Sequence, residues 1–300
     1  MRARIICLGH AVLDRIYRLE RFPTRATKIR ASHCLEIGGG MAANAAVAIA
    51  RLGGQAALWS RVGDDSAGVE IVAGLAREGV ECSSVRHFSG AVSSTSCILV
   101  DAAGERMIVN HRGEGLLDDP SWLPLGDIAG AAAVLADARW GAGALALFKA
   151  ARRSGVPTVM DADVSSSELL PAILPLTDYC LFSGPGLAEW GGEDVEAALG
   201  KALAAGARHA GVTLGGAGYS WRGAGGAAGY QPGFSIRAVD TTGAGDAFHG
   251  AFAHAVGEGL QPPAAARLAA AVAALKCMHA GSRKGLPSRA EAEAFLAQHS

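Results

Sequence analysis

The sequence lacks an excess of charge of either sign. Its 300 residues carry a formal net charge of −1, and only 18% of them are Asp, Glu, Lys or Arg. A surface that binds nucleic acid normally needs concentrated basic residues, so this balance argues against a nucleic-acid partner. The chain also lacks an apolar run long enough to span a bilayer, and we therefore expect no membrane partner.

Cysteine is scarce and irregularly spaced. The six cysteines include no Cys-x-x-Cys pair. This spacing favours reduced thiols over a disulfide framework or a zinc site. Residues 1–8 resemble the start of a strand and contain no signal-peptide cleavage pattern. Together these features predict a cytoplasmic protein.

Internal repeats and low-complexity linkers are absent too, so the fold class must come from the apolar pattern. Half of the residues are hydrophobic, which is enough for a substantial core. Short apolar segments are found at 5–8, 134–136, 158–160, 180–182 and 211–214, and helical stretches such as 144–154 and 195–205 separate them. This alternation predicts an α/β fold with a doubly wound, mostly parallel sheet, in one domain over residues 1–300.

Two stretches do not follow this alternation. Residues 15–37 contain few helix signals, and residues 94–110 contain two strand-like runs that Gly104 separates. We predict that about 15–37 and 90–112 form a second, smaller β-sheet.

The glycine-rich stretch Asp240–Gly250 carries the strongest chemical signal. It precedes an apolar helical pattern, so the amides of Gly243, Ala244, Gly245 and Asp246 would lie unpaired at a helix N-terminus. Unpaired amides and the helix dipole bind anions. A carboxylate among them would repel a bound anion, so Asp246 suggests a general base beside a transferring phosphoryl group. A capped helix is the alternative.

A second glycine-rich stretch, Gly38–Asn44, opens an alanine-rich helical pattern that ends at Gly53. Its glycines would let a ligand approach the backbone closely, although a simple turn before a packed helix is also possible. Together, Gly38–Asn44 and Asp240–Phe248 resemble the two signatures of the ribokinase (PfkB) family of carbohydrate kinases. The resemblance implies a ribokinase-like fold and an ATP-dependent kinase acting on a sugar hydroxyl.

The resemblance also implies which residues contact the two substrates. The implied sugar contacts are Asp14, Gly39, Gly40, Asn44 and the base Asp246. The implied nucleotide contacts are Thr213, Gly215, Gly218, Gly243 and Gly245. The smaller sheet would be a lid over the sugar, and such lids often pair with the lid of a second subunit. A homodimer is therefore expected.

Two aspartates are candidates for a magnesium site. Asp161 and Asp163 follow the apolar segment 158–160, and carboxylates at a strand end that faces phosphates suit Mg²⁺. Helix capping is the alternative role. The Asn-x-x-Glu sequence common in the family is missing, because residues 183–186 are Ser-Gly-Pro-Gly and Glu189 lies three residues late.

Asp240 and Thr242, with carbonyl groups beyond Cys277, resemble the family's monovalent-cation loop. The resemblance therefore adds K⁺ to ATP and Mg²⁺ as an expected cofactor.

Several segments narrow the resemblance to the 6-deoxy-6-sulfofructose kinases within the family. They are Asp14–Tyr17, Leu135–Trp140, Phe182–Ala188, Asp246–Ala251 and Ala273–Cys277. This resemblance implies that Lys28, Asn110 and Arg139 hold a sulfonate, whose three oxygens suit an ammonium, an amide and a guanidinium. The reaction would phosphorylate the 1-hydroxyl. A sugar phosphate and neutral fructose stay open as substrates, and a silent sugar or nucleotide sensor stays open as a function.

Overall fold

A large twisted sheet forms the centre of the computed structural model, which describes residues 2–299. The strand order is β13-β12-β11-β10-β9-β8-β1-β4-β5, and all neighbours are parallel except β11-β12 and β12-β13. The strands are β1 Arg4–Leu8, β4 Gln55–Gly63, β5 Val85–Phe88, β8 Ala133–Asp137, β9 Thr158–Ala162, β10 Tyr179–Ser183, β11 His209–Thr213, β12 Gly218–Gly223 and β13 Ala228–Pro232. The predicted doubly wound, mostly parallel sheet is confirmed.

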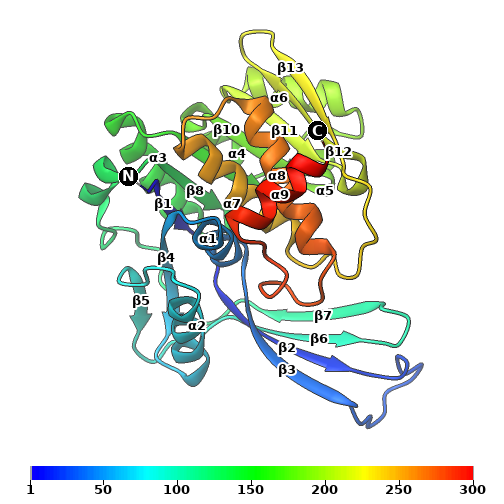
Figure 1. Ribbon diagram of the computed structural model, residues 1–300. Helices are drawn as coiled ribbons and strands as arrows, with labels where there is room; N and C mark the ends of the chain where they lie inside the picture. The colour runs from blue at the N-terminus through cyan, green and yellow to red at the C-terminus, as the bar shows by residue number, and fades with distance from the viewer. Residues whose placement is uncertain (1, 300) are drawn as a thin grey trace.

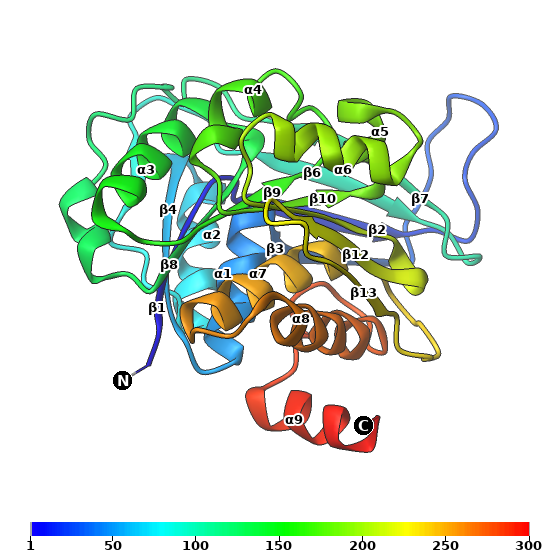
Figure 2. The same ribbon diagram turned by 90° about the horizontal axis from the view of Figure 1, so that it is seen from above.

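Helices cover both faces of this sheet (Figure 2). One face carries α1 Met41–Arg51, α2 Ser66–Arg77, α7 Ala244–Gly257, α8 Pro262–Cys277 and α9 Arg289–Gln298. The other carries α3 Gly141–Ser154, α4 Leu170–Ile173, α5 Gly184–Gly191 and α6 Val195–Ala204. Strand β1 shows why both layers are needed, because Ile5 and Cys7 pack into the first core whereas Ile6 and Leu8 pack into the second.

A separate four-stranded sheet projects from this body, at the bottom of Figure 1. Its order is β3-β2-β6-β7, with β2 Val12–Arg18, β3 His33–Gly39, β6 Thr95–Val100 and β7 Arg106–His111. Gly104 turns the β6-β7 hairpin with φ 86°. The predicted small sheet is confirmed, and we call it the lid. That residues 1–300 form one domain stays a prediction.

The chain order places several loops at one crevice. Strand β1 lies between β4, which follows it on one side, and β8, which begins the run of strands on the other side. Ligands of open α/β sheets bind at the carboxyl ends of the strands where the order reverses in this way. The segments that leave β1, β8 and β9 therefore define where a site should lie.

Two further features of the described residues concern the helices and the cysteines. None of the helices within residues 2–299 combines the length and the apolar character that a membrane crossing requires. All six cysteines are free, and three of them are buried.

Candidate active site

Two pockets lie on either side of the segment Thr241–Asp246. The first has a volume of about 510 Å³ and opens toward the lid, and Asp14, Asn44 and Asp246 are among its lining residues. The second has a volume of about 430 Å³ and is lined in part by Thr213 and Gly245. Volumes of this size suit small-molecule ligands. One short turn thus faces two separate pockets.

The segment between the pockets begins helix α7. Gly243 is the N-cap with φ 76°, and the first intrahelical bond runs from the Ala247 amide to the Gly243 carbonyl. The amides of Gly245 and Asp246 precede that bond and lie at the positive end of the helix dipole. A Cβ atom at Gly243 would lie 2.5 Å from Ser282 Oγ, so the close approach requires glycine. The Ala244 amide, which was predicted to be unpaired, donates to the Thr241 carbonyl at 3.2 Å, so the Gly245 and Asp246 amides are the ones that fit the predicted anion site.

Asp246 is held by a chain of side chains from distant parts of the sequence. Asn44 Nδ2 donates to Asp246 Oδ2 at 2.7 Å, and Asn44 Oδ1 accepts from Arg283 Nε at 2.9 Å. Arg283 also donates to the carbonyl of Gly39 at 3.1 Å and is only 8% exposed. Arg283 was not predicted, because no motif near it marks a buried arginine.

The environment of Asp246 suits a base. Burial, and then the charge of Asp161, raises the pKa of Asp246 to about 7, although the hydrogen bond from Asn44 opposes the shift. General bases work best when their pKa lies near the working pH. The carboxylate predicted as the base is therefore tuned to neutral pH by its surroundings.

The lid contributes one polar row to the first pocket. Asp14 on β2 pairs in register with Ser96 on β6, and Ser96 pairs with Asn110 on β7. Residues in register on neighbouring strands face the same side of a sheet, and all three line the pocket. Asn110 Nδ2 donates to Ser96 Oγ at 3.0 Å, and burial raises the pKa of Asp14. Ser96 was not predicted.

Glycines let the backbone approach this row. A Cβ atom at Gly39 would lie 2.1 Å from Asp14 Oδ2. Gly40 lines the first pocket as the N-cap of α1, with φ 94°. The structure thus brings the predicted sugar contacts Asp14, Gly39, Gly40 and Asn44 together, with Asp246 beside them.

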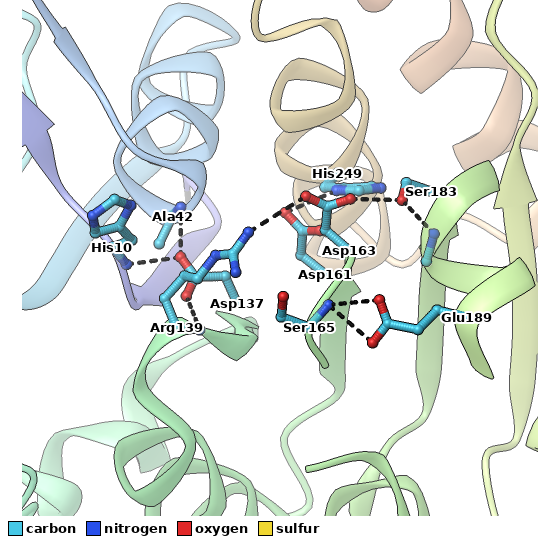
Figure 3. A network of polar contacts seen from close by, with 11 residues as sticks. His10, Ala42, Asp137, Arg139, Asp161, Asp163, Ser165, Ser183, Glu189 and His249 are labelled. Carbon is cyan, nitrogen blue, oxygen red and sulfur yellow. Dashed lines mark hydrogen bonds and ion pairs between the residues drawn. The ribbon is translucent and has the colours of Figure 1, made fainter. Parts of the chain in front are cut away.

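A buried aspartate that the sequence did not single out holds three segments at the crevice (Figure 3). Asp137 is 0% exposed and accepts hydrogen bonds from the amides of His10 at 2.7 Å, Ala42 at 3.1 Å and Arg139 at 2.9 Å. His10 lies just after β1, Ala42 lies in the first turn of α1, and Arg139 lies just after β8. Asp137 therefore fixes the backbone that carries His10 and Arg139 without itself lining either pocket.

Positive charge gathers at one end of the first pocket. Arg61, Arg112 and Arg139 line it together with His10, whose Nε2 lies 2.8 Å from Ser94 Oγ. Burial, and then these three arginines, lowers the pKa of His10 to about 4. Arg139 is 3.7 Å from Asp163.

Lys28 is not part of this group. It lies in the exposed segment between β2 and β3, and it is not among the residues that line the pocket. Its predicted contact with a sulfonate therefore finds no support in this arrangement, and it stays a prediction.

The two candidate magnesium ligands differ in their surroundings (Figure 3). Asp163 lines the first pocket and accepts from Ser183 Oγ at 2.6 Å. Asp161 is 1% exposed, and its Oδ2 lies 3.0 Å from Nδ1 of His249 on α7. Burial alone would lower the pKa of His249, but the Asp161 carboxylate raises it above its usual value. The Asp161 carboxylate is thus buried against His249 and does not line the first pocket.

Mg²⁺ commonly needs only one or two carboxylates besides phosphates and water. Asp163 fits that requirement because it is accessible and faces the pocket of Asp246. Glu189 does not, because both of its oxygens accept hydrogen bonds from the Ser165 amide and one accepts from Ser167 Oγ. Asp163 is therefore the residue that would hold Mg²⁺ here.

The second pocket contains the predicted nucleotide contacts. Gly215 and Gly218 have φ values of 57° and 116°, and they line the pocket with Thr213. Ala270, Ala273 and Ala274 of α8 form part of the opposite wall, together with other small and apolar side chains. Such a wall leaves room for a flat aromatic ring. Gly245 reaches this pocket, whereas Gly243 faces the first.

Asp240 and Thr242 lie just before this turn. Thr242 N donates to Asp240 Oδ1 at 2.9 Å, and Arg106 on the lid hydrogen-bonds to both side chains. Burial would raise the pKa of Asp240, but hydrogen bonds from the amide and the side chain of Thr242 and from the Gly281 amide, with the charge of Lys276, hold that pKa far below its usual range. A monovalent cation at Asp240 and Thr242 stays a prediction.

The family model described as "pfkB family carbohydrate kinase" matches residues 2–289. The chain belongs to this family.

This carbohydrate kinase is similar to proteins named ribokinases. It is 29% identical to the Bacillus subtilis ribokinase over 297 residues, covering 98% of this chain and 99% of that protein. A solved Agrobacterium tumefaciens structure of a candidate ribokinase is 38% identical with a TM-score of 0.94, covering 100% of this chain and 99% of the other. The Arabidopsis thaliana ribokinase, solved with ribose and ATP, is 26% identical with a TM-score of 0.88, covering 99% of both chains.

The family assignment makes the chain an enzyme that transfers a phosphoryl group to an alcohol, and it sets aside a silent sensor. The relatives above are named ribokinases and not sulfofructose kinases, so the comparisons support the family and leave the sugar open.

We predict that Asp246→Asn lowers kcat by about 10²–10⁴-fold, the usual contribution of a general base. Asparagine has nearly the same shape but cannot accept the proton of the hydroxyl. Binding of nucleotide and sugar should change little, as measured by calorimetry. A variant that keeps most of its turnover would contradict the assignment of Asp246 as the base.

The raised pKa of Asp246 predicts an acid limb in the rate profile. Below about pH 7 the carboxyl group becomes protonated, so kcat/KM should fall about tenfold per pH unit. The pH profile of the residual activity of Asp246→Asn is the control, because every other titratable group of the protein, and ATP itself, is the same in both measurements. The same limb in both proteins would show that another group titrates.

Magnesium titration should distinguish the two aspartates. Asp163→Asn should raise the Mg²⁺ concentration for half-maximal rate by about 10-fold, the loss typical of a ligand that acts through water. Asp161→Asn is the matched control, because its carboxylate is turned toward His249, and its half-saturating Mg²⁺ should stay unchanged. Equal shifts in both variants would contradict this division.

Proposed function

We propose that this kinase uses ATP to phosphorylate the primary 1-hydroxyl of an anionic ketohexose derivative, and that the sugar is 6-deoxy-6-sulfofructose. The observation that carries the proposal is the group of arginines at one end of the first pocket. Arg61, Arg112 and Arg139 line this pocket with His10, whose pKa falls to about 4 through burial first and then through their charges. The hydroxyl-binding aspartates Asp14 and Asp246 also line the pocket.

This distribution of charge suits a sugar with an anion at the far end. An anion at that end would give these guanidinium groups a charge-assisted partner, which a neutral sugar would not supply. Arg61 is already engaged, since it donates to the carbonyls of Leu116 and Leu117 and pairs with Asp118. Arg112 and Arg139, with the Asn110 amide, are the groups that would contact the anion.

The proposed reaction uses the turn between the pockets. The sugar hydroxyl would lie beside Asp246, which takes its proton, and the amides at the start of α7 would stabilise the charge of the transferred phosphoryl group. Mg²⁺ at Asp163 would neutralise phosphate charge. The lid would exclude water and so limit wasteful hydrolysis of ATP.

Ribose is the second candidate, because the Bacillus subtilis relative is named a ribokinase and the Arabidopsis thaliana structure contains ribose with ATP. Fructose and a fructose phosphate also remain candidates. A fructose phosphate would use the same arginines as the sulfonate, whereas ribose and fructose would not.

A homodimer through the lid forms part of the proposal. Met107, Ile108 and Val109 on β7 are 50–63% exposed. A strand that exposes apolar side chains on both faces suits contact with a second lid.

We predict that Arg139→Ala lowers kcat/KM for the anionic sugar by about two to four decades. Two charge-assisted hydrogen bonds, each worth roughly 1.5–3 kcal/mol, give a loss of this size. The effect should fall mainly on KM, because the anion is remote from the transferred group. Arg139→Lys should recover only part, because an ammonium cannot reproduce the planar fork.

The measurement is a panel of 6-deoxy-6-sulfofructose, fructose 6-phosphate, fructose and ribose. Arg153→Ala is the matched control, since Arg153 is exposed at the other end of α3, about 20 Å along the helix. Equal losses of Arg139→Ala on neutral and anionic sugars would show that Arg139 serves the fold or its neighbour Asp163. The proposed substrate would then be wrong.

A further inference from the structure

Lys276, in the last turn of α8, is the one lysine in the described residues with a side chain that is 0% exposed. Its Nζ donates to the backbone carbonyl of Asp240 at 2.7 Å and lies 3.9 Å from Asp240 Oδ1. Burial lowers the pKa of Lys276, whereas the charge of Asp240 opposes that change. A buried ammonium is costly, so its position against these oxygens calls for an explanation.

The oxygens that Lys276 contacts belong to the segment that leads into the anion-binding turn. Asp240 Oδ1 also accepts from Arg106 at 2.7 Å, and Asp240 Oδ2 accepts from the Gly281 amide at 3.0 Å. The amides of Val239 and Asp240 both donate to the carbonyl of Cys277, next to Lys276. Val239 and Asp240 are thus fixed to the end of α8, and Asp240 lies three residues before Gly243, the N-cap of α7.

The same oxygens are those at which the family resemblance implies a monovalent cation. The residues present do not fit such an ion. The ammonium of Lys276 already contacts the Asp240 carbonyl, and the Arg106 guanidinium already pairs with its carboxylate. A third positive charge within about 4 Å of these two would be repelled strongly in a buried site.

We propose that the Lys276 ammonium takes the place of the monovalent cation at Asp240, so that the turn before α7 is ordered without added K⁺. Lys276 is then a positioning residue, which acts on the anion site through Asp240. The inference rests on the kinase reaction that the family establishes and does not depend on which sugar is phosphorylated.

The first test needs no substitution. The full-length protein is exchanged into a buffer free of K⁺, Na⁺ and NH₄⁺, and KCl is compared with choline chloride at equal ionic strength. Activity, measured with whichever sugar of the panel is phosphorylated, and the thermal midpoint of the ligand-free protein should each be the same in the two salts. A severalfold activation, or a raised midpoint, in KCl alone would overturn the proposal. The midpoint is informative even if the substrate proposal fails.

The second test opens the position to an ion. Lys276→Ala should lose about 10-fold or more in kcat/KM for ATP, the scale of a lost supporting contact, and KCl or NH₄Cl should restore part of the loss. Lys276→Met should lose as much without rescue, because its side chain fills the space. Lys149→Met, at an exposed position on α3, is the matched control.

The thermal midpoint separates this role from packing. Lys276→Ala should be stabilised by KCl more than by choline chloride, whereas the unsubstituted protein should not. Full activity in both variants, or a loss in Lys276→Ala that no small cation reverses in rate or midpoint, would overturn the proposal. If neither variant folds, the salt comparison on the unsubstituted protein still decides.

Discussion

The contacts from Asp246 through Asn44 to Arg283 are the constraint on which the site depends. They join α7, α1 and the segment after α8, and Asn44 is more than 200 residues away in the sequence from both Asp246 and Arg283. Arg283 also reaches the carbonyl of Gly39, where the lid strand β3 meets α1. Burial lowers the pKa of Arg283 to about 10, although the charges of Glu78, Asp14 and Asp246 oppose the shift. Three elements that line the first pocket are therefore fixed around one buried cation.

A second constraint is electrostatic. Asp246 has its pKa raised to about 7 by burial and then by the charge of Asp161, while Asp161 itself lies against His249 one turn further along α7. At the other end of the same pocket, burial and then the charges of three arginines lower the pKa of His10. The pocket thus combines a proton acceptor that is easily charged at neutral pH with a region that favours anions.

Much of the fold and part of the site followed from local sequence. The parallel strands were predictable because short apolar runs alternate with helical ones, and the lid was predictable because its segments break that alternation. The start of α7 was predictable because glycines and a helix N-terminus have the same physical effect in any fold. Asp137, Ser96, Arg283 and Lys276 were not predictable, because their partners lie on other elements and their own neighbours in sequence give no signal.

The sequence by itself determined the sheet, the lid and the anion-binding turn with Asp246, because these depend on periodicity and on backbone freedom over a few residues. Only the tertiary structure decided which charged groups meet. It separated Asp163, which faces the pocket, from Asp161, which is buried against His249, although the two are two residues apart. It also left Lys28 outside the pocket and brought Lys276 to Asp240. Charges act through distance and burial, and both are set by the packing of elements that are remote in the chain.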